Sequence, residues 1–384
     1  MKIIFFTNAY KPIISGVVRA ISLFTLGLRE KGHKVYIFAP AYRNWTDEEP
    51  DIFRFPAVNL SRQIYFPIAI PYYPKLDEIL QRIKPDIIHI HHPFVLGETG
   101  LKQARRLKIP AVYTFHTQYE QYAHYFPLPT RLVQKIARDR IRSFARRVDR
   151  LTAPAQSVAE LLRGYGVEKP VTVLPNPIEP AMFQNTDPRN VRERYGLTGM
   201  QILLSAGRLA REKNLGLLLQ AFAIIHDDFP KLRLIVVGSG PAGESLRQEA
   251  LELGIAGKVI FTGRVSDEEL PSFFHAASLF IMTSLTETFG IVMAEAMAAG
   301  LPVVAVAANG SGDLITPGLN GLLTTNGPQS LAAAIRFLLT DEAQRARMGK
   351  AARQAAQRYS VSSVTGELIA LYETAIQESR TIYE

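Results

Sequence analysis

Two glutamates separated by seven residues, Glu287 and Glu295, enclose the segment E-T-F-G-I-V-M-A-E. This segment follows a predicted strand and opens a predicted helix, so Phe289, Gly290 and Ile291 would lie at a helix N-terminus. Free backbone N–H groups and the helix dipole favour a phosphate there. Glu295 would lie about one and a half turns further on, and the two carboxylates could reach opposite ends of one ligand. From spacing alone, one helix-start acid and one solvated glutamate fit equally well.

Two cations follow another predicted strand, at residues 202–206. Arg208 and Lys213 lie in the segment G-R-L-A-R-E-K-N. A guanidinium presents a planar fork to a diphosphate, and a lysine presents a point charge. Such a pair is also compatible with a solvated loop. Its position at the carboxyl end of a strand, in the same half of the chain as the two glutamates, favours a diphosphate clamp.

A third motif, Gly238-Ser-Gly240-Pro-Ala-Gly243, matches G-x-G-x-x-G after the predicted strand 232–237. A dinucleotide-binding fingerprint needs an acid at the end of the next strand, about 20 residues further on. That strand ends in Thr-Gly-Arg264 and offers no acid. We interpret the motif as a tight turn near the ligand, and a nicotinamide-dependent oxidoreductase as a distant alternative.

The first half of the chain offers weaker candidates. Ser15 and Gly16 lie between a predicted strand and a predicted helix. The start of that helix could provide a second set of contacts to the phosphates of a ligand. His116 ends the predicted strand 111–116, where it could either bind a sugar or have a purely structural role. His89 and His91 share one face of a strand, but no carboxylate or cysteine pattern accompanies them, so we predict no metal site.

Residues 113–126 hold six aromatic rings in fourteen positions, in a predicted loop. Residues 131–150 follow, with eight basic side chains against two acids on one predicted helix. A basic amphipathic helix beside an aromatic loop is typical of a membrane-surface element, although a core-packed helix with a solvated basic face is the plainer interpretation. The predicted apolar stripe is Leu132, Val133, Ile136, Ala137, Ile141, Phe144 and Val148. The candidate membrane and acceptor residues are Tyr119, Tyr122, Tyr125, Phe126, Arg131, Lys135, Arg138, Arg142 and Arg146.

The elements that must position these residues are those of an α/β protein. Short apolar runs alternate with helical patterns over the 384 residues, as in parallel sheets with helical crossovers. The order restarts after P-N-P-I-E-P at 175–180, which we interpret as a hinge. We therefore predict two Rossmann-like, doubly wound domains facing each other across a cleft, at 1–175 and 176–359. A final helix at about 360–384 would pack back on the first domain.

Charge and cysteine content limit the partners. Residues 1–175 hold 26 Lys and Arg against 14 Asp and Glu, whereas the rest hold 18 against 21. The basic half indicates an anionic partner, either a membrane surface or nucleic acid. The absence of cysteine excludes disulfides and thiolate metal sites. No apolar run reaches the roughly 20 residues that span a bilayer, and we expect no signal peptide because the apolar stretch at the N-terminus is too short. We expect a cytoplasmic protein that is soluble or peripheral to the membrane.

In this order and spacing, the motifs resemble those of the family 4 retaining glycosyltransferases of the GT-B fold. The resemblance covers essentially the whole chain, although many members have Gly-Gly where this chain has Ser15-Gly16. It implies a nucleotide-sugar donor whose diphosphate binds Arg208 and Lys213. Glu287 would hold the sugar and Glu295 the ribose, Val265 would lie near the base, and His116 would act at the reaction centre. The implied donor-binding residues are Gly16, Arg208, Lys213, Gly238, Val265, Glu287, Phe289, Gly290, Ile291, Val292 and Glu295.

The resemblance also implies chemistry. The anomeric configuration would be retained without a covalent intermediate, and the leaving phosphate would take the acceptor's proton. The Arg208 and Lys213 pair and the helix dipole would stabilise its charge, so no cofactor and no divalent metal are expected.

Residues 114–127 are similar to those of bacterial diacylglycerol glucosyltransferases, which make membrane glycolipids from UDP-glucose. Phosphatidylinositol mannosyltransferases fit this segment less well. We therefore expect α-glucosyl transfer to 1,2-diacylglycerol by an enzyme at the inner face of the cell membrane. The alternatives are a GDP-mannose enzyme, an enzyme with a soluble sugar acceptor, and a nucleic-acid-binding protein. The last would leave Arg208, Glu287 and Glu295 without a purpose, so we expect no nucleic acid partner.

Overall fold

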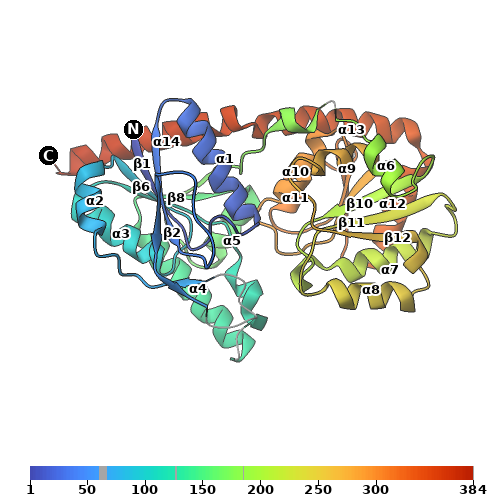
Figure 1. Ribbon diagram of the computed structural model, residues 1–384, viewed down its shortest axis with the longest axis horizontal. Helices are drawn as coiled ribbons and strands as arrows, with labels where there is room; N and C mark the ends of the chain where they lie inside the picture. The colour runs from blue at the N-terminus through green and yellow to red at the C-terminus, as the bar shows by residue number, and fades with distance from the viewer. Residues whose placement is uncertain (60–66, 126–127, 185, 384) are drawn as a thin grey trace. The chain divides into compact units, whose positions relative to one another are not determined.

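The computed structural model describes residues 1–59, 67–125, 128–184 and 186–383 (Figure 1). The chain divides into two compact units. Unit 1 contains Met1–Pro177 and Val361–Glu384, and unit 2 contains Ile178–Ser360.

Unit 1 is built on a seven-stranded parallel sheet in the order β3-β2-β1-β6-β7-β8-β9. Its strands are β1 (Lys2–Phe6), β2 (Lys34–Pro40), β3 (Ile52–Phe55), β6 (Ile87–Ile90), β7 (Ala111–Thr114), β8 (Arg150–Ala153) and β9 (Val171–Val173). A short antiparallel pair joins β4 (Ala57–Val58) to β5 (Ile68–Ala69). The helices are α1 (Gly16–Glu30), α2 (Leu76–Ile83), α3 (Leu96–Leu107), the 3₁₀ helix η1 (Tyr119–Tyr125), α4 (Thr130–Arg147), α5 (Gln156–Gly164) and α14 (Val361–Tyr383).

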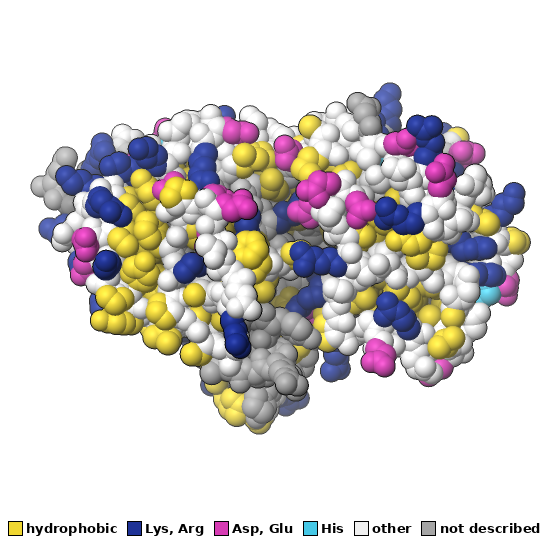
Figure 2. Space-filling view, viewed as in Figure 1, with side chains coloured by type: hydrophobic (Ala, Val, Ile, Leu, Met, Phe, Trp, Pro, Cys, Tyr) yellow, Lys and Arg dark blue, Asp and Glu magenta, His cyan; other side chains and the backbone are white. Residues whose placement is uncertain are grey.

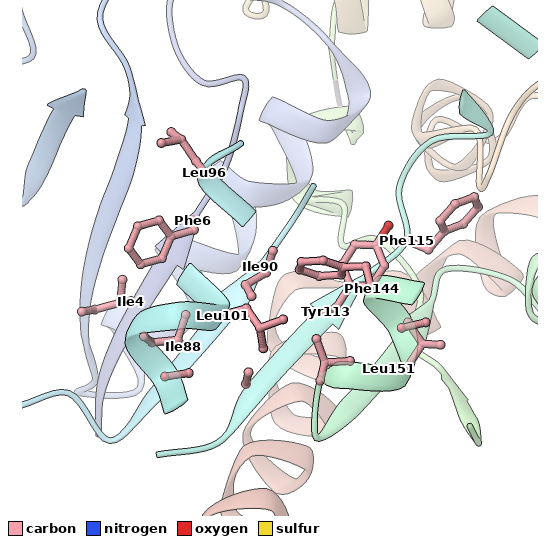
Figure 3. Packing of buried hydrophobic residues seen from close by; sticks show 14 of the residues in the cluster. Ile4, Phe6, Ile88, Ile90, Leu96, Leu101, Tyr113, Phe115, Phe144 and Leu151 are labelled. Carbon is pink, nitrogen blue, oxygen red and sulfur yellow. The ribbon is translucent and has the colours of Figure 1, made fainter. Parts of the chain in front are cut away.

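The central strands of unit 1 are buried on both faces, as strands between two layers of helices are. Figure 3 shows one side, where Phe6 of β1 and Ile90 of β6 lie near Leu96 and Leu101 of α3. Helix α14 belongs to this unit through its packing on α1. A Cβ on Gly27 would lie 2.3 Å from the Thr365 hydroxyl oxygen, so a glycine is required at this helix crossing.

Unit 2 is built on a six-stranded parallel sheet in the order β12-β11-β10-β13-β14-β15. Its strands are β10 (Gln201–Ala206), β11 (Leu232–Val237), β12 (Val259–Gly263), β13 (Leu279–Met282), β14 (Val303–Val306) and β15 (Gly321–Thr324). Its α-helices are α6 (Arg189–Arg194), α7 (Leu215–Ile225), α8 (Gly243–Glu252), α9 (Leu270–Ala276), α10 (Ile291–Ala298), α11 (Ser311–Leu314), α12 (Pro328–Thr340) and α13 (Glu342–Ala356). Its 3₁₀ helices are η2 (Pro180–Phe183), η3 (Arg211–Lys213), η4 (Ala256–Lys258) and η5 (Gln357–Tyr359).

The structure confirms the predicted fold class of two Rossmann-like parallel sheets, and adds strands that the sequence pattern did not indicate. Both β3 and β15 are edge strands of four residues, and neither has the continuous burial of the central strands. The pair β4 and β5 has only two residues in each strand. Within the described residues, no helix is both long enough and apolar enough to cross a bilayer.

Candidate functional site

The predicted diphosphate-binding residues Arg208 and Lys213 lie on the loop after β10, at the carboxyl edge of the sheet. Strand β10 ends at Ala206, and the backbone of Gly207 donates to Val237 at the end of β11 over 3.0 Å. The G-x-G-x-x-G turn lies directly against this loop. A Cβ on Gly238 would lie 1.9 Å from the Gly207 carbonyl oxygen, and one on Gly240 would lie 2.3 Å from that of Leu209. These glycines therefore let one loop pack on the other, and so support the loop that carries Arg208.

Arg208 and Lys213 each pair with a carboxylate of unit 2. The Lys213 ammonium donates to Glu287, and the Arg208 guanidinium donates to Glu212. Burial alone would raise the pKa of Glu287, but the charge of Lys213 and its hydrogen bond hold that pKa below the usual value for glutamate. The Lys213–Glu287 pair connects the loop after β10 to the loop before α10. The structure thus brings together two motifs that lie 74 residues apart.

Glu212 was not among the predicted site residues, although it precedes Lys213 in the motif. Its side chain is 1% exposed and its backbone carbonyl accepts from the Ser284 hydroxyl over 3.3 Å. Asn214, which follows, has the left-handed angles φ 54° and ψ 37° from which α7 begins. Asparagine is one of the few non-glycine residues that adopts this conformation readily. An acid followed two residues later by asparagine was the available signal for this tight turn.

The two-glutamate motif opens α10 as the sequence predicted. Gly290 precedes the helix with φ 82°, and the N–H groups of Ile291 and Val292 belong to the first turn, which offers them no acceptor within the helix. Phe289 packs edge-on against the Tyr359 ring, with centroids 5.1 Å apart. Glu295 is 2% exposed, on the same short helix. Helix α10 therefore places N–H groups and a buried carboxylate within about one turn of each other.

Two further positions frame this motif. A Cβ on Gly310, which has φ 76°, would lie 2.6 Å from the Glu287 carbonyl oxygen and 2.4 Å from the Thr288 carbonyl carbon. Only glycine allows this segment to support the Glu287 loop, and no motif in the neighbouring sequence indicates this role. Val265 is half-buried two residues beyond β12.

In unit 1, Gly16 is exposed at the first position of α1. Ser15 is the N-cap of that helix, and its hydroxyl accepts from the backbone N–H of Val18 over 3.2 Å. This explains the serine in chemical terms, since N-cap serine satisfies one of the free N–H groups at a helix start.

His116 lies two residues beyond the end of β7, whereas the sequence predicted that the strand would include it. Phe115 still donates its N–H to Thr152 of the neighbouring β8, and the chain then leaves the sheet and turns into η1. His116 is 5% exposed, and its Nε2 lies 2.9 Å from Nδ1 of His91. Burial, followed by the charges of His92 and His89, lowers the pKa of His116 well below its ordinary value. The imidazole is therefore neutral at physiological pH.

Within the aromatic segment, Tyr113 belongs to β7, and Tyr119–Tyr125 forms the 3₁₀ helix η1 where a loop was predicted. It contains Tyr119, Tyr122 and Tyr125, and the last two rings stack with centroids 6.2 Å apart. Its conformation is fixed by Glu120, a buried carboxylate that accepts from the Tyr165 hydroxyl beside α5. Phe126, another predicted membrane residue, lies outside the described residues.

Helix α4 differs from its predicted pattern in one respect. Ala137, Ile141 and Phe144 are buried, but Leu132 and Ile136 are 46% and 54% exposed. They were predicted to lie in the apolar stripe that packs on the domain. They are instead on the exposed side, where Leu128, four residues earlier, is also 54% exposed. In the space-filling view, hydrophobic and basic side chains share the surface near the start of α4 (Figure 2).

The basic side chains of α4 form two groups. Arg131, Lys135 and Arg138 line a hollow of about 300 Å³ between α4 and Tyr165, which we call the α4 hollow. The other group has acidic neighbours: Arg142 pairs with Asp139 over 2.9 Å, Arg146 with Glu168 over 3.7 Å, and Arg140 and Arg147 with Glu98. Asp139 also lines the hollow, but it pairs with Arg142, so positive charge is less compensated at the hollow than along the rest of the helix.

The division into units also corrects the predicted charge asymmetry. Unit 1 holds 27 Lys and Arg against 18 Asp and Glu, because α14 brings acids to it, and unit 2 holds 17 of each. The excess of +9 therefore belongs entirely to unit 1. Within the part of the chain that the structure describes, no group of three or more His, Cys, Asp or Glu side chains is placed to hold a metal ion.

Comparisons with known proteins agree with this architecture. Residues 14–181 match the model of "Glycosyltransferase Family 4", and residues 189–355 match that of "Glycosyl transferases group 1". The chain is 34% identical to an alpha-monoglucosyldiacylglycerol synthase of Streptococcus pneumoniae, over 87% of this chain and 77% of the relative. It is 28% identical to the enzyme of the same name from Acholeplasma laidlawii, over 79% and 80%. A GDP-mannose-dependent alpha-mannosyltransferase of Corynebacterium glutamicum is 27% identical, over 100% and 91%.

Solved structures share the fold at lower identity. Anabaena HepE in complex with UDP superposes with a TM-score of 0.80 at 23% identity, over 97% of this chain and 100% of that one. Sucrose-phosphate synthase from Thermosynechococcus elongatus gives a TM-score of 0.81 at 20% identity, over 98% and 99%. Two parallel sheets, two matching family models and a relative at 34% identity agree. The chain therefore belongs to the family 4 glycosyltransferases, with the GT-B fold.

Proposed function

We propose that this glycosyltransferase transfers an α-glucosyl group from UDP-glucose to 1,2-diacylglycerol at an anionic membrane surface, on the cytoplasmic side. The observation that carries the donor site is the ion pair between Lys213 and Glu287, which joins the cationic loop to the start of α10. A nucleoside diphosphate meets two cations and a helix N-terminus there, which together suit its charge.

The ion pair suggests how the donor is received. A β-phosphate oxygen would replace Glu287 as the partner of Lys213, because a diphosphate carries more charge than one carboxylate. Glu287 would then be free to accept hydrogen bonds from hydroxyls of the glucosyl group. Arg208 would bind the same diphosphate while Glu212 holds its guanidinium in place, and Glu295 would accept from the ribose. The further residues that this proposal assigns to the donor are Gly16, Gly238, Val265, Phe289, Gly290, Ile291 and Val292.

The reaction would proceed with retention of configuration. The bond between the anomeric carbon and the β-phosphate oxygen breaks, and a bond to the acceptor hydroxyl oxygen forms on the same face. The acceptor proton passes to the leaving phosphate oxygen. Lys213, Arg208 and the N–H groups at the start of α10 stabilise the charge that develops on that phosphate. In this proposal no metal ion takes part, since the cations supply the charge.

The lipid acceptor is supported by the surface of unit 1 and by the relatives. Leu128, Leu132 and Ile136 expose apolar side chains beside the basic α4 hollow, and Tyr122 and Tyr125 lie on the neighbouring 3₁₀ helix. This combination suits the boundary between headgroups and acyl chains. Two relatives are named alpha-monoglucosyldiacylglycerol synthases, and a solved neighbour contains UDP and glucose.

A related enzyme that uses GDP-mannose is the second candidate, because one relative that covers the whole chain is named as GDP-mannose-dependent. The test offers UDP-glucose, UDP-galactose and GDP-mannose separately, with anionic vesicles that contain diacylglycerol. A glucolipid from UDP-glucose alone is the expected product. A mannolipid from GDP-mannose would replace the donor assignment, and an unmodified lipid beside slow donor hydrolysis would remove the acceptor assignment.

A further inference from the structure

The loop that carries Lys213 is bound to the carboxyl end of β13 by three side-chain hydrogen bonds. The Thr283 hydroxyl donates to the Lys213 backbone carbonyl over 2.8 Å, and the Asn214 amide donates to the Thr283 carbonyl over 3.4 Å. The Ser284 hydroxyl lies 3.3 Å from the carbonyl oxygen of Glu212. Three consecutive residues of the loop therefore contact the two residues that follow β13.

The bond from Thr283 is the shortest of the three and is shielded from water. Thr283 is 1% exposed, and its hydroxyl carries a single proton, which the Lys213 carbonyl accepts. The next residue of the turn, Asn214, has the left-handed angles φ 54° and ψ 37°. The side chain of Lys213 therefore leaves a turn whose carbonyl direction is fixed by Thr283.

The same end of β13 also contacts the other partner of the ion pair. Ser284 is fully buried. Burial would raise the pKa of Glu287, and the charge and hydrogen bond of Lys213, followed by a hydrogen bond from Ser284, lower it. Thr283 and Ser284 are consecutive, so one point of the sheet supports both partners. The geometry of the Lys213–Glu287 pair therefore depends on the end of β13.

We propose that Thr283 is a positioning residue that acts through Lys213. By fixing the Lys213 carbonyl, its hydroxyl places the ammonium where it meets the diphosphate of the nucleotide sugar and the charge that develops on the leaving phosphate. A displacement of about 1 Å is enough to cost about 10²-fold in the rate of such a reaction. The inference rests on the proposed function insofar as Lys213 binds the donor diphosphate.

Two variants of Thr283 separate its hydroxyl from its shape. Thr283→Val keeps the branched shape and removes the hydroxyl, whereas Thr283→Ser keeps the hydroxyl. We expect Thr283→Val to bind UDP about tenfold more weakly in calorimetry, the worth of one hydrogen bond, and to lower kcat/KM for UDP-glucose at least as much. Thr283→Ser should retain most of both. Wild-type UDP affinity in Thr283→Val would overturn the proposal, as would equal losses in the two variants.

A double-mutant cycle with Lys213→Met shows whether Thr283 acts through the lysine. If it does, adding Thr283→Val to Lys213→Met causes no further loss of UDP affinity, because no ammonium remains to be misplaced. Additive losses would assign Thr283 a purely structural role and overturn the proposal.

The matched control is Thr25→Val in unit 1. Thr25 is 4% exposed, and its hydroxyl also donates to a backbone carbonyl, that of Ile21, over 2.8 Å. This variant should lower the unfolding midpoint by a similar amount and leave UDP affinity unchanged. A loss of UDP affinity as large as that of Thr283→Val would overturn the specific role of Thr283.

The cycle is also read without nucleotide, in unfolding midpoints. Thr283→Val should lower the midpoint less in the Lys213→Met background than in the wild type, because only the wild type has the Lys213–Glu287 pair to disturb. Equal effects in the two backgrounds would overturn the proposal. The expected difference in a protein that binds neither UDP nor GDP would refute the proposed function and leave the effect of Thr283 on the position of Lys213 intact.

Discussion

Replacing Lys213 with methionine tests the proposed donor site directly, because this lysine joins the loop after β10 to the two-glutamate segment that opens α10. The ion pair with Glu287 is partly buried, with side-chain exposures of 26% and 15%. Its loss leaves a carboxylate with little water and no cation, and should destabilise the fold by about 1–3 kcal/mol. For a unit of this size, that corresponds to a fall of roughly 2–12 °C in the unfolding midpoint. Transfer should fall by about 10²–10³, the usual effect of removing one group that stabilises developing charge.

The pH dependence supplies a sharper test of the same pair. In the wild type the pKa of Glu287 is depressed, so the pair stabilises the fold above the unfolded pKa of about 4.3 and loses its effect as pH falls through the folded value. In Lys213→Met the hydrogen bond from Ser284 remains, but burial is the larger effect and should raise the pKa of Glu287, so the variant is destabilised as pH rises through the new value. The difference in unfolding midpoint between the two proteins should therefore be large at pH 7.5 and small near pH 4.

The matched control is Arg211→Met, which removes one charge from the exposed neighbour in the same 3₁₀ turn. It should retain transfer activity and show no such pH-dependent difference. Unfolding midpoints for Lys213→Met that differ from wild type equally at pH 4 and pH 7.5 would refute the reasoning about the pair. Wild-type transfer rates in Lys213→Met would refute the donor-site assignment itself.

Three further predictions follow from the described contacts. Replacing the three basic side chains of the α4 hollow with glutamine should weaken binding to anionic vesicles by about 10²-fold, at about 1 kcal/mol for each charge, while UDP binding in calorimetry stays unchanged. The same change at Arg142 and Arg146, which have acidic partners, should cost less, and equal losses would contradict the distinction between the two groups. Gly310→Ala should lower both the unfolding midpoint and kcat, because its Cβ would displace the Glu287 loop; an unchanged kcat would show that the loop tolerates the shift. Tyr372→Phe should lower stability by about 1 kcal/mol in denaturant titration through the lost bond to His89, and an unaltered midpoint would show that this bond contributes nothing.

Much of the architecture could be predicted because central strands of a parallel sheet have an unbroken apolar pattern. Strand β11 was predicted to the residue, at 232–237, and the two-glutamate segment opens α10 as predicted. The edge strands β3 and β15 were missed because they are short and only partly buried, so their residues resemble those of loops. Leu132 and Ile136 were misplaced because they keep a helical spacing to the buried stripe, and spacing does not show how far a neighbouring element covers a helix.

The site shows the same division between local and long-range information. Arg208, Lys213 and Glu287 could be selected from their positions after strands. Their pairing could not, because it depends on two loops 74 residues apart meeting at one edge of the sheet. Glu212 and Gly310 are more instructive, since both act on another residue of the site. Glu212 holds a guanidinium and Gly310 makes room for a loop; the sequence near Glu212 indicates the turn at Asn214, but it indicates neither of these two roles.

The place of α14 has a consequence for how the chain acquires its structure during synthesis. Tyr372 on this helix bonds to His89 in the middle of the first sheet, across 283 residues of sequence. At about 5–20 residues per second, a ribosome needs roughly 15–60 s to make the intervening chain. Throughout that interval the strands of unit 1 lack the helix that covers α1, whereas unit 2 is contiguous and can fold first. The nascent first sheet therefore waits with apolar surface exposed, which is the state that chaperones recognise.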